Sequence, residues 1–96
     1  MKYMTDAMLA GLAKELRKKG IDCETVHKLM RETEDSRIKI DDPDIVQFLR
    51  GKKDSITLIT LDGQLAKYCK IDEIPHILVQ DLVANHILER QLSSTR

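Results

Sequence analysis

The chain has 96 residues, 42% of them hydrophobic and 33% charged, a composition typical of one globular domain rather than a disordered segment. Its 16 basic and 16 acidic residues give a formal net charge of zero, so any contact with nucleic acid must come from a local patch. Two tyrosines, one phenylalanine and no tryptophan argue against a base-stacking platform.

Cysteine usage and hydropathy indicate the compartment. Cys23 and Cys69 stand far apart, with no CxxC pair and no histidine at zinc-ligand spacing, and are interpreted as buried thiols in a reducing compartment. No run approaches the ~20 apolar residues of a membrane span. Asp6 interrupts the first apolar run before a signal-peptide core can form. We therefore expect a cytoplasmic protein with no membrane partner.

The first part of the chain is predicted to alternate strands and helices. Residues 2–5 are predicted as a short buried strand, and residues 7–19 as a helix whose leucines recur at helical spacing and which Gly20 terminates. Residues 21–26 are predicted as a strand and residues 27–31 as one or two helical turns.

A strong helix start follows a polar stretch. Asp42 is predicted as the N-cap and Pro43 as the first helical residue, in a helix that ends at Gly51. Residues 56–60 (ITLIT) are rich in β-branched side chains and predict the clearest strand. Residues 64–70 are predicted as a short helix.

The last part of the chain repeats the alternation. Residues 76–80 are predicted as a strand, and Asp81 as the cap of an amphipathic helix whose apolar stripe belongs to the core or to a dimer surface. Residues 93–96 are predicted as a frayed tail after a single domain over residues 1–92. Strands separated by helices predict an α/β fold, a three-layer α/β/α sandwich with a small, mainly parallel sheet of about four strands.

Aspartates stand where strands end. Asp6 and Asp62 follow two predicted strands, and Asp42 and Asp44 begin a helix between them in sequence. The carboxyl ends of parallel strands share one edge, so these acids can form a cluster that binds a divalent cation. Oxygen ligands favour magnesium or manganese. The alternative is local: aspartate caps helices and forms turns without any metal.

Three blocks of sequence carry a resemblance. The first, residues 6–22 (DAMLAGLAKELRKKGID), combines an aspartate, Met-Leu, spaced leucines, Leu-Arg and a closing glycine. The second is DPDIVQFL, with Asp42 and Asp44; the third is TLITLDGQLAKYC, with Thr60 and Asp62. In this order the blocks resemble a compact family of PIN-like domains, and they span most of the first seventy or so residues.

The resemblance implies a metal-dependent ribonuclease fold related to the nucleases of toxin–antitoxin systems. It implies that Asp6 and Asp62 are ligands of magnesium or manganese, and that Asp42 or Asp44 completes the set. It leaves open a homodimer and a protein inhibitor as partners. The chain departs from the family in having Gln64 where a further acid is common, in lacking a zinc ribbon, and in an insertion-like stretch at residues 32–41.

A basic end to the first predicted helix is the candidate RNA contact. Lys14, Arg17 and Lys18 lie there, and Lys14 and Arg17 share a helix face. Basic residues at a helix C-terminus also complement the helix dipole without any ligand.

The main hypothesis is a magnesium- or manganese-dependent endoribonuclease in which Asp6, Asp42 and Asp62 are catalytic. The alternative is a PIN-like module that has lost catalysis and binds RNA or protein, which Gln64 and the zero net charge favour. A phosphoacceptor receiver domain is disfavoured, because no lysine ends the predicted strand at residues 76–80.

Overall fold

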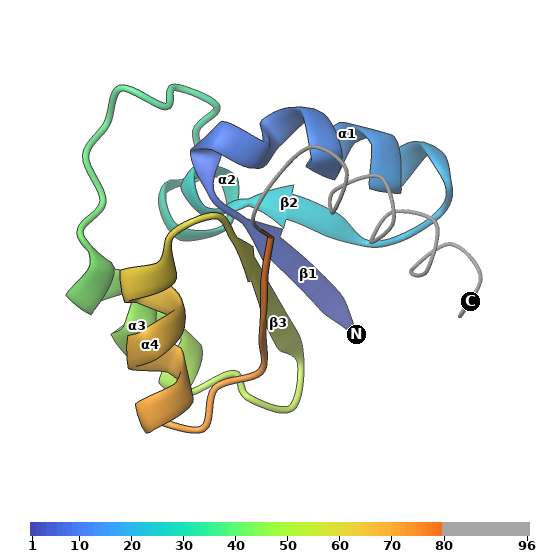
Figure 1. Cartoon of the computed structure of the whole chain (residues 1–96). Helices are drawn as coiled ribbons and strands as arrows, with labels where there is room; N and C mark the ends of the chain where they lie inside the picture. The colour runs from blue at the N-terminus through green and yellow to red at the C-terminus, as the bar shows by residue number, and fades with distance from the viewer. Residues whose placement is uncertain (80–96) are drawn as a thin grey trace.

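The computed structural model describes residues 1–79, which form a four-stranded, all-parallel sheet with helices between the strands (Figure 1). The strands are β1 (Lys2–Thr5), β2 (Cys23–Thr25), β3 (Ile56–Thr60) and β4 (His76–Leu78). Their order across the sheet is β2-β1-β3-β4. The predicted α/β class and small parallel sheet are confirmed.

The helices occupy the predicted segments. They are η1 (Ala7–Leu9), α1 (Ala10–Lys18), α2 (Val26–Arg31), α3 (Asp42–Arg50) and α4 (Gly63–Ile71). The helix predicted over residues 7–19 opens as the 3-10 turn η1, in which the Leu9 N–H donates to the Asp6 carbonyl at 2.9 Å. It closes through Gly20, whose φ of 83° lies in the left-handed region that favours glycine.

The start of α3 differs from the prediction by one residue. Asp41, not Asp42, is the N-cap, and the backbone N–H groups of Asp44 and Ile45 donate to its carbonyl at 3.0 and 3.2 Å. Pro43 is tolerated anywhere in the first turn, where an N–H has no helical partner, so the sequence does not distinguish the two adjacent aspartates. The end of α3 before Gly51 is as predicted.

The chain order reverses at the centre of the sheet. From β1 the chain passes through α1 to β2 on one side, and from β3 through α4 to β4 on the other. The reversal lies between β1 and β3, which pair in parallel with Thr5 opposite Ile59. Residues that follow β1 and β3 therefore emerge side by side at the carboxyl edge, where ligands bind in folds of this class.

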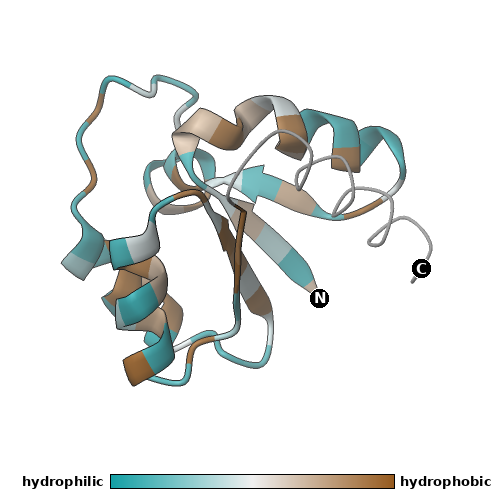
Figure 2. Ribbon diagram, viewed as in Figure 1, coloured by the Kyte–Doolittle hydropathy of each residue, from teal (hydrophilic) through white to brown (hydrophobic). Residues whose placement is uncertain are grey.

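Two apolar clusters stabilise the sheet. One joins the strands to α2, α3 and α4 and contains Met4, Val26, Ile45, Val46, Leu49, Ile56, Leu58, Leu65, Cys69 and Ile74. The other joins the strands to α1 and contains Leu9, Ala13, Leu16, Ile21, Cys23, Ile59 and Val79. Adjacent residues of β3 enter different clusters because successive side chains of a strand point to opposite faces. Figure 2 shows the apolar character of β3 and the polar second half of α1.

The predicted burial of the two cysteine thiols is confirmed. Cys23 and Cys69 are free and buried. Burial raises the pKa of Cys23 to about 12 and that of Cys69 to about 11, so both thiols stay protonated at neutral pH. None of the helices within residues 1–79 has the length and apolar character that a membrane span needs. The predicted cap Asp81, the helix after it, the tail and the domain end at residue 92 lie outside the described residues.

Candidate active site

Asp6 stands directly after β1, at the point where the strand order reverses. Its backbone N–H donates to the Ile59 carbonyl at 3.2 Å, which extends the pairing of β1 with β3. Its carboxylate Oδ2 accepts hydrogen bonds from the Thr60 hydroxyl and from the Leu61 N–H, the latter at 2.9 Å. It makes no side-chain cap to η1, so the helix-cap alternative does not describe Asp6.

Asp62 does act as a helix cap. Its Oδ1 accepts from the backbone N–H groups of Gln64 at 2.9 Å and Leu65 at 3.3 Å, at the start of α4. Among residues 1–79, no group hydrogen bonds to the second oxygen, Oδ2. The local explanation therefore accounts for one oxygen of an exposed carboxylate and leaves the other available.

Thr60 connects the two acids. It is fully buried, its hydroxyl donates to the Asp6 carboxylate, and the same oxygen accepts from the Asp62 N–H at 3.0 Å. The buried Thr5 hydroxyl, in contrast, has no partner in the part of the chain that the structure describes. The difference arises because Thr60 lies one strand away from Asp6, whereas Thr5 precedes Asp6 on the same strand.

Asp42 approaches the pair from the first turn of α3. It lines a depression of about 400 Å³ together with Asp6 and Asp62. The three side chains come from three different elements that are 36 and 20 residues apart in sequence. Of the four acids expected at the site, the structure brings these three together.

The pKa values of Asp6 and Asp42 reflect the closeness of these carboxylates. Burial raises the pKa of the Asp6 carboxyl above its ordinary value; the hydrogen bonds from Thr60 and Leu61 oppose the rise, and the negative charge of Asp62 adds to it. Burial also raises the pKa of Asp42, and the negative charges of Asp62 and Asp6 raise it further. The Asp6 carboxyl is therefore harder to ionise beside Asp62, and the Asp42 carboxyl is harder to ionise beside Asp6 and Asp62.

Asp44 lies apart from this group. It is exposed in the first turn of α3 and faces the Arg31 guanidinium, with 4.0 Å between Oδ2 and Nη2. It does not line the depression. Asp42, rather than Asp44, is therefore the helix residue that accompanies Asp6 and Asp62.

Apolar side chains and a histidine complete the depression. Met8 is 83% exposed at its rim, and Ile40 reaches it from the segment before α3. His27 also lines it and is 93% buried, since its exposed fraction is 7%. The ring Nε2 lies 2.6 Å from the Ile38 carbonyl, which can only accept, so Nε2 carries the proton. The spacing of His27 from the other histidines and acids in the sequence gives no signal of this position.

The donor set consists of carboxylate oxygens. The Oδ2 of Asp62 and the Asp42 carboxylate have no hydrogen bond to another group within residues 1–79. In the same range, no three side chains of the metal-binding types lie close enough together to form a direct ligand cage. Oxygen donors that leave coordination positions to water suit magnesium and manganese, which keep several water ligands.

Comparisons with family models, with curated proteins and with solved structures found no match to this chain. The resemblance to PIN-like domains therefore remains a prediction from the sequence blocks. The geometry of the site stands on the structure alone.

The predicted basic residues differ in their availability. Arg17 donates through Nη1 to the Cys23 carbonyl at 2.9 Å and pairs with Glu24 at 3.2 Å. Lys18 pairs with Glu15 at 3.3 Å, one turn earlier on α1. Lys14 lines a second depression, of about 260 Å³, with Arg17 and with Lys28 of α2. The ammonium groups of Lys14 and Lys28 have no carboxylate partner within residues 1–79, so they are the available positive charges of this patch.

Proposed function

We propose that the protein is a magnesium- or manganese-dependent endoribonuclease with a three-layer, PIN-like α/β/α sandwich. The observation that carries the proposal is the convergence of Asp6, Asp42 and Asp62 on one depression at the carboxyl edge of the sheet. Repulsion between clustered carboxylates makes such a site unfavourable unless a cation or a proton neutralises it. The two buried free thiols support a cytoplasmic location.

The three acids are held in different ways. Asp6 is fixed by the Thr60 hydroxyl and the Leu61 N–H, and Asp62 by the first turn of α4. Asp42 is carried by the first turn of α3. Carboxylates fixed before binding lose little entropy when a ligand arrives, which favours correct positioning. When bound, a divalent cation would supply an activated water and would offset negative charge on a phosphodiester.

The test is cleavage of single-stranded RNA in the presence of manganese. Asp6→Asn and Asp62→Asn keep the size of each side chain and remove its charge, and each is expected to lower the rate at least about 100-fold, as expected when charge stabilisation at a reacting phosphate is lost. Asp44→Asn is the matched control, because it removes an acid from the same helix turn as Asp42 but outside the depression. Equal residual cleavage by all four proteins would identify a contaminant and end the proposal.

The second candidate is a PIN-like module that binds RNA or protein without cutting it. Two observations favour it: the absence of a direct three-ligand cage within residues 1–79, and the use of one Asp62 oxygen to cap α4. Calorimetric titration with manganese distinguishes the candidates. Binding that Asp6→Asn abolishes supports the nuclease, whereas no detectable binding to the wild type supports the module.

A further inference from the structure

The acidic depression continues into a groove between α3 and α4. A depression of about 480 Å³ shares Ile40 and Asp42 with the candidate active site. The depression of about 480 Å³ also shares Pro43 and Tyr68 with a neighbouring depression of about 360 Å³. We call this neighbouring depression the α3–α4 groove. Ligand pockets commonly measure roughly 300–1,000 Å³, so the groove is large enough for a small flat ring.

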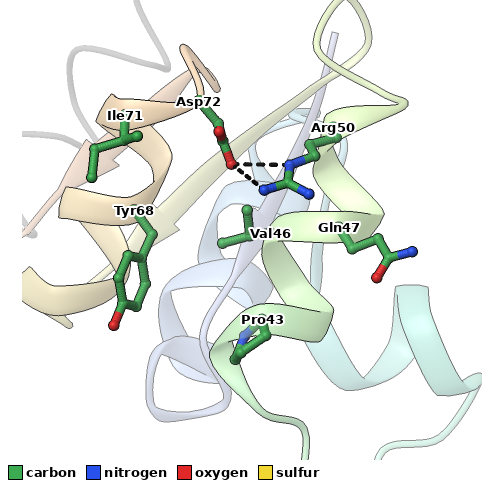
Figure 3. Close-up of a pocket in the computed structure, with 7 residues that line it drawn as sticks. All are labelled: Pro43, Val46, Gln47, Arg50, Tyr68, Ile71 and Asp72. Carbon is green, nitrogen blue, oxygen red and sulfur yellow. Dashed lines mark hydrogen bonds and ion pairs between the residues drawn. The ribbon is translucent and has the colours of Figure 1, made fainter.

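The walls of the α3–α4 groove are apolar. Figure 3 shows Tyr68 and Ile71 on α4 and Pro43 and Val46 on α3, on opposite sides of it. Tyr68 is 38% exposed and Ile71 is 69% exposed, so the two side chains form an exposed apolar pair on adjacent turns of α4. The Tyr68 hydroxyl has no hydrogen bond to any residue from 1 to 79. The exposed part of the ring and its hydroxyl are therefore open to a ligand.

The end of the groove is polar but close to neutral. The Arg50 Nε and Nη2 donate to one oxygen of Asp72 at 3.0 and 2.8 Å (Figure 3). The third Arg50 nitrogen (Nη1), the second Asp72 oxygen (Oδ1) and the Gln47 amide remain as donors and acceptors. Because Asp72 neutralises Arg50, this end does not suit a phosphate group. It suits a ligand with apolar faces and an uncharged, hydrogen-bonding edge.

From these walls and this edge we propose that the α3–α4 groove binds one base of a single-stranded RNA, stacked on Tyr68, next to the phosphodiester at the acidic site. This inference rests on the proposed function for the identity of the ligand. Aromatic side chains bind bases through their π-faces, with a tolerance for all four bases. The low aromatic content of the chain argues against a platform of several stacked bases, and this inference needs one ring only, that of Tyr68.

The first experiment follows the Tyr68 ring directly. The chain has two tyrosines, so Tyr3→Phe leaves Tyr68 as the only source of tyrosine ring resonances. In EDTA, adenosine monophosphate is expected to shift the Tyr68 ring protons upfield through the ring current of a stacked base. Ribose 5-phosphate is the matched probe without a base and should leave them in place. Equal shifts with both probes, or no shift with either, would overturn the inference.

The second experiment measures affinity for a single-stranded oligoribonucleotide, again in EDTA. Tyr68→Ala is expected to weaken binding about tenfold, the scale of one lost stacking contact, whereas Tyr68→Phe keeps the π-face and stays within about twofold of the wild type. Leu78→Ala is the control, because Leu78 has the same 38% exposure and lies outside the groove. Wild-type affinity in Tyr68→Ala would contradict the proposal. So would a dimer, seen by sedimentation, that Tyr68→Ala dissociates.

These measurements are independent of cleavage. If manganese-dependent cleavage requires Asp6 but Tyr68→Ala binds RNA like the wild type, the base site is wrong and the nuclease proposal stands. If adenosine monophosphate stacks on Tyr68 but no RNA is cut, the base site stands and the nuclease proposal fails.

Discussion

Asp6 combines two roles that oppose each other energetically. Its carboxylate is fixed by the Thr60 hydroxyl and the Leu61 N–H, yet burial and the charge of Asp62 make its ionised form unfavourable. A residue placed for packing alone would gain nothing from this charge. A carboxylate that binds a cation benefits from being held in position before binding, because the cation then supplies the opposite charge that stabilises its ionised form.

The pH dependence of stability should report this cost. The pKa of Asp6 is raised above 3.8 in the folded state, so the native protein binds this proton more readily than the unfolded chain does. The free energy of unfolding should therefore rise as the pH falls from neutral through the folded pKa of Asp6, and Asp42 should act in the same direction. Urea denaturation at several pH values measures the change. Asp6→Asn should flatten the profile, and an unchanged profile would show that Asp6 ionises freely.

Thr60 supplies a second prediction for a single residue. Thr60→Val keeps the shape of the side chain but removes the hydroxyl that links the Asp6 carboxylate to the Asp62 N–H. We expect a loss of about 1–3 kcal/mol in the free energy of unfolding, because a buried N–H and a carboxylate lose a partner. Thr57→Val is the control on the same strand, since the Thr57 hydroxyl contacts only the Met1 sulfur at 2.9 Å among the described residues. Equal losses in both variants would indicate a general effect of valine in β3.

At the scale of the element, α4 depends on the residue that serves the candidate site. Asp62 caps the first turn of α4 with Oδ1, while the rest of its carboxylate faces the acidic depression. A helix N-terminus attracts negative charge, so the cap also lowers the cost of placing a third carboxylate near Asp6 and Asp42. The same side chain therefore stabilises a helix and contributes to the proposed cation site.

Two substitutions separate these roles of Asp62. Asparagine is an effective N-cap, so Asp62→Asn should change the free energy of unfolding by only a few tenths of a kcal/mol. Asp62→Ala removes the cap and should cost about 1 kcal/mol. Both remove the charge and should reduce manganese-dependent cleavage equally. Cleavage that follows stability instead of charge would show that Asp62 acts only as a cap.

The sequence pattern was sufficient to predict the helices and strands within residues 1–79, but not the residues at which some of them begin. The ITLIT strand and α3 were predictable because β-branched runs and a Pro in the first turn each have one structural interpretation. The cap of α3 was not, because Asp41 and Asp42 are adjacent aspartates before Pro43, and aspartate suits the N-cap at either position. The 3-10 opening of η1 was not either, because the leucine spacing of residues 7–19 fits both helix types over one turn.

At the scale of the molecule, topology made part of the site predictable. Any parallel sheet that reverses its order between β1 and β3 places Asp6 and Asp62 side by side, whatever the details of packing. The choice of Asp42 over Asp44 was not predictable, because it depends on the path of residues 32–41, which carry no periodic pattern. His27 was missed for the same reason, since its partner is a backbone carbonyl in that segment.

The path of residues 32–41 leads to the last prediction. This segment links α2 to α3 and leads directly into Asp42. Near its middle, the Ile38 carbonyl accepts a hydrogen bond from the Nε2–H of the buried His27 at 2.6 Å. His27→Ala should release the segment and raise the rate of its amide hydrogen exchange. It should also weaken manganese binding roughly tenfold, although every carboxylate remains. The reason is that losing a buried hydrogen bond costs about 1–3 kcal/mol when a group is left unsatisfied.

Arg37→Ala is the matched control for His27→Ala. Arg37 lies in the same segment but is exposed and pairs only with Asp35, at 2.9 Å among the described residues, so its loss should change neither exchange near Asp42 nor manganese affinity. If both variants bind manganese like the wild type, Asp42 is positioned by α3 itself, and the anchored segment is only a connection. If His27→Ala alone weakens manganese binding, His27 positions Asp42 indirectly. It would do so through its hydrogen bond to the Ile38 carbonyl, since no hydrogen bond within residues 1–79 joins it to the three carboxylates.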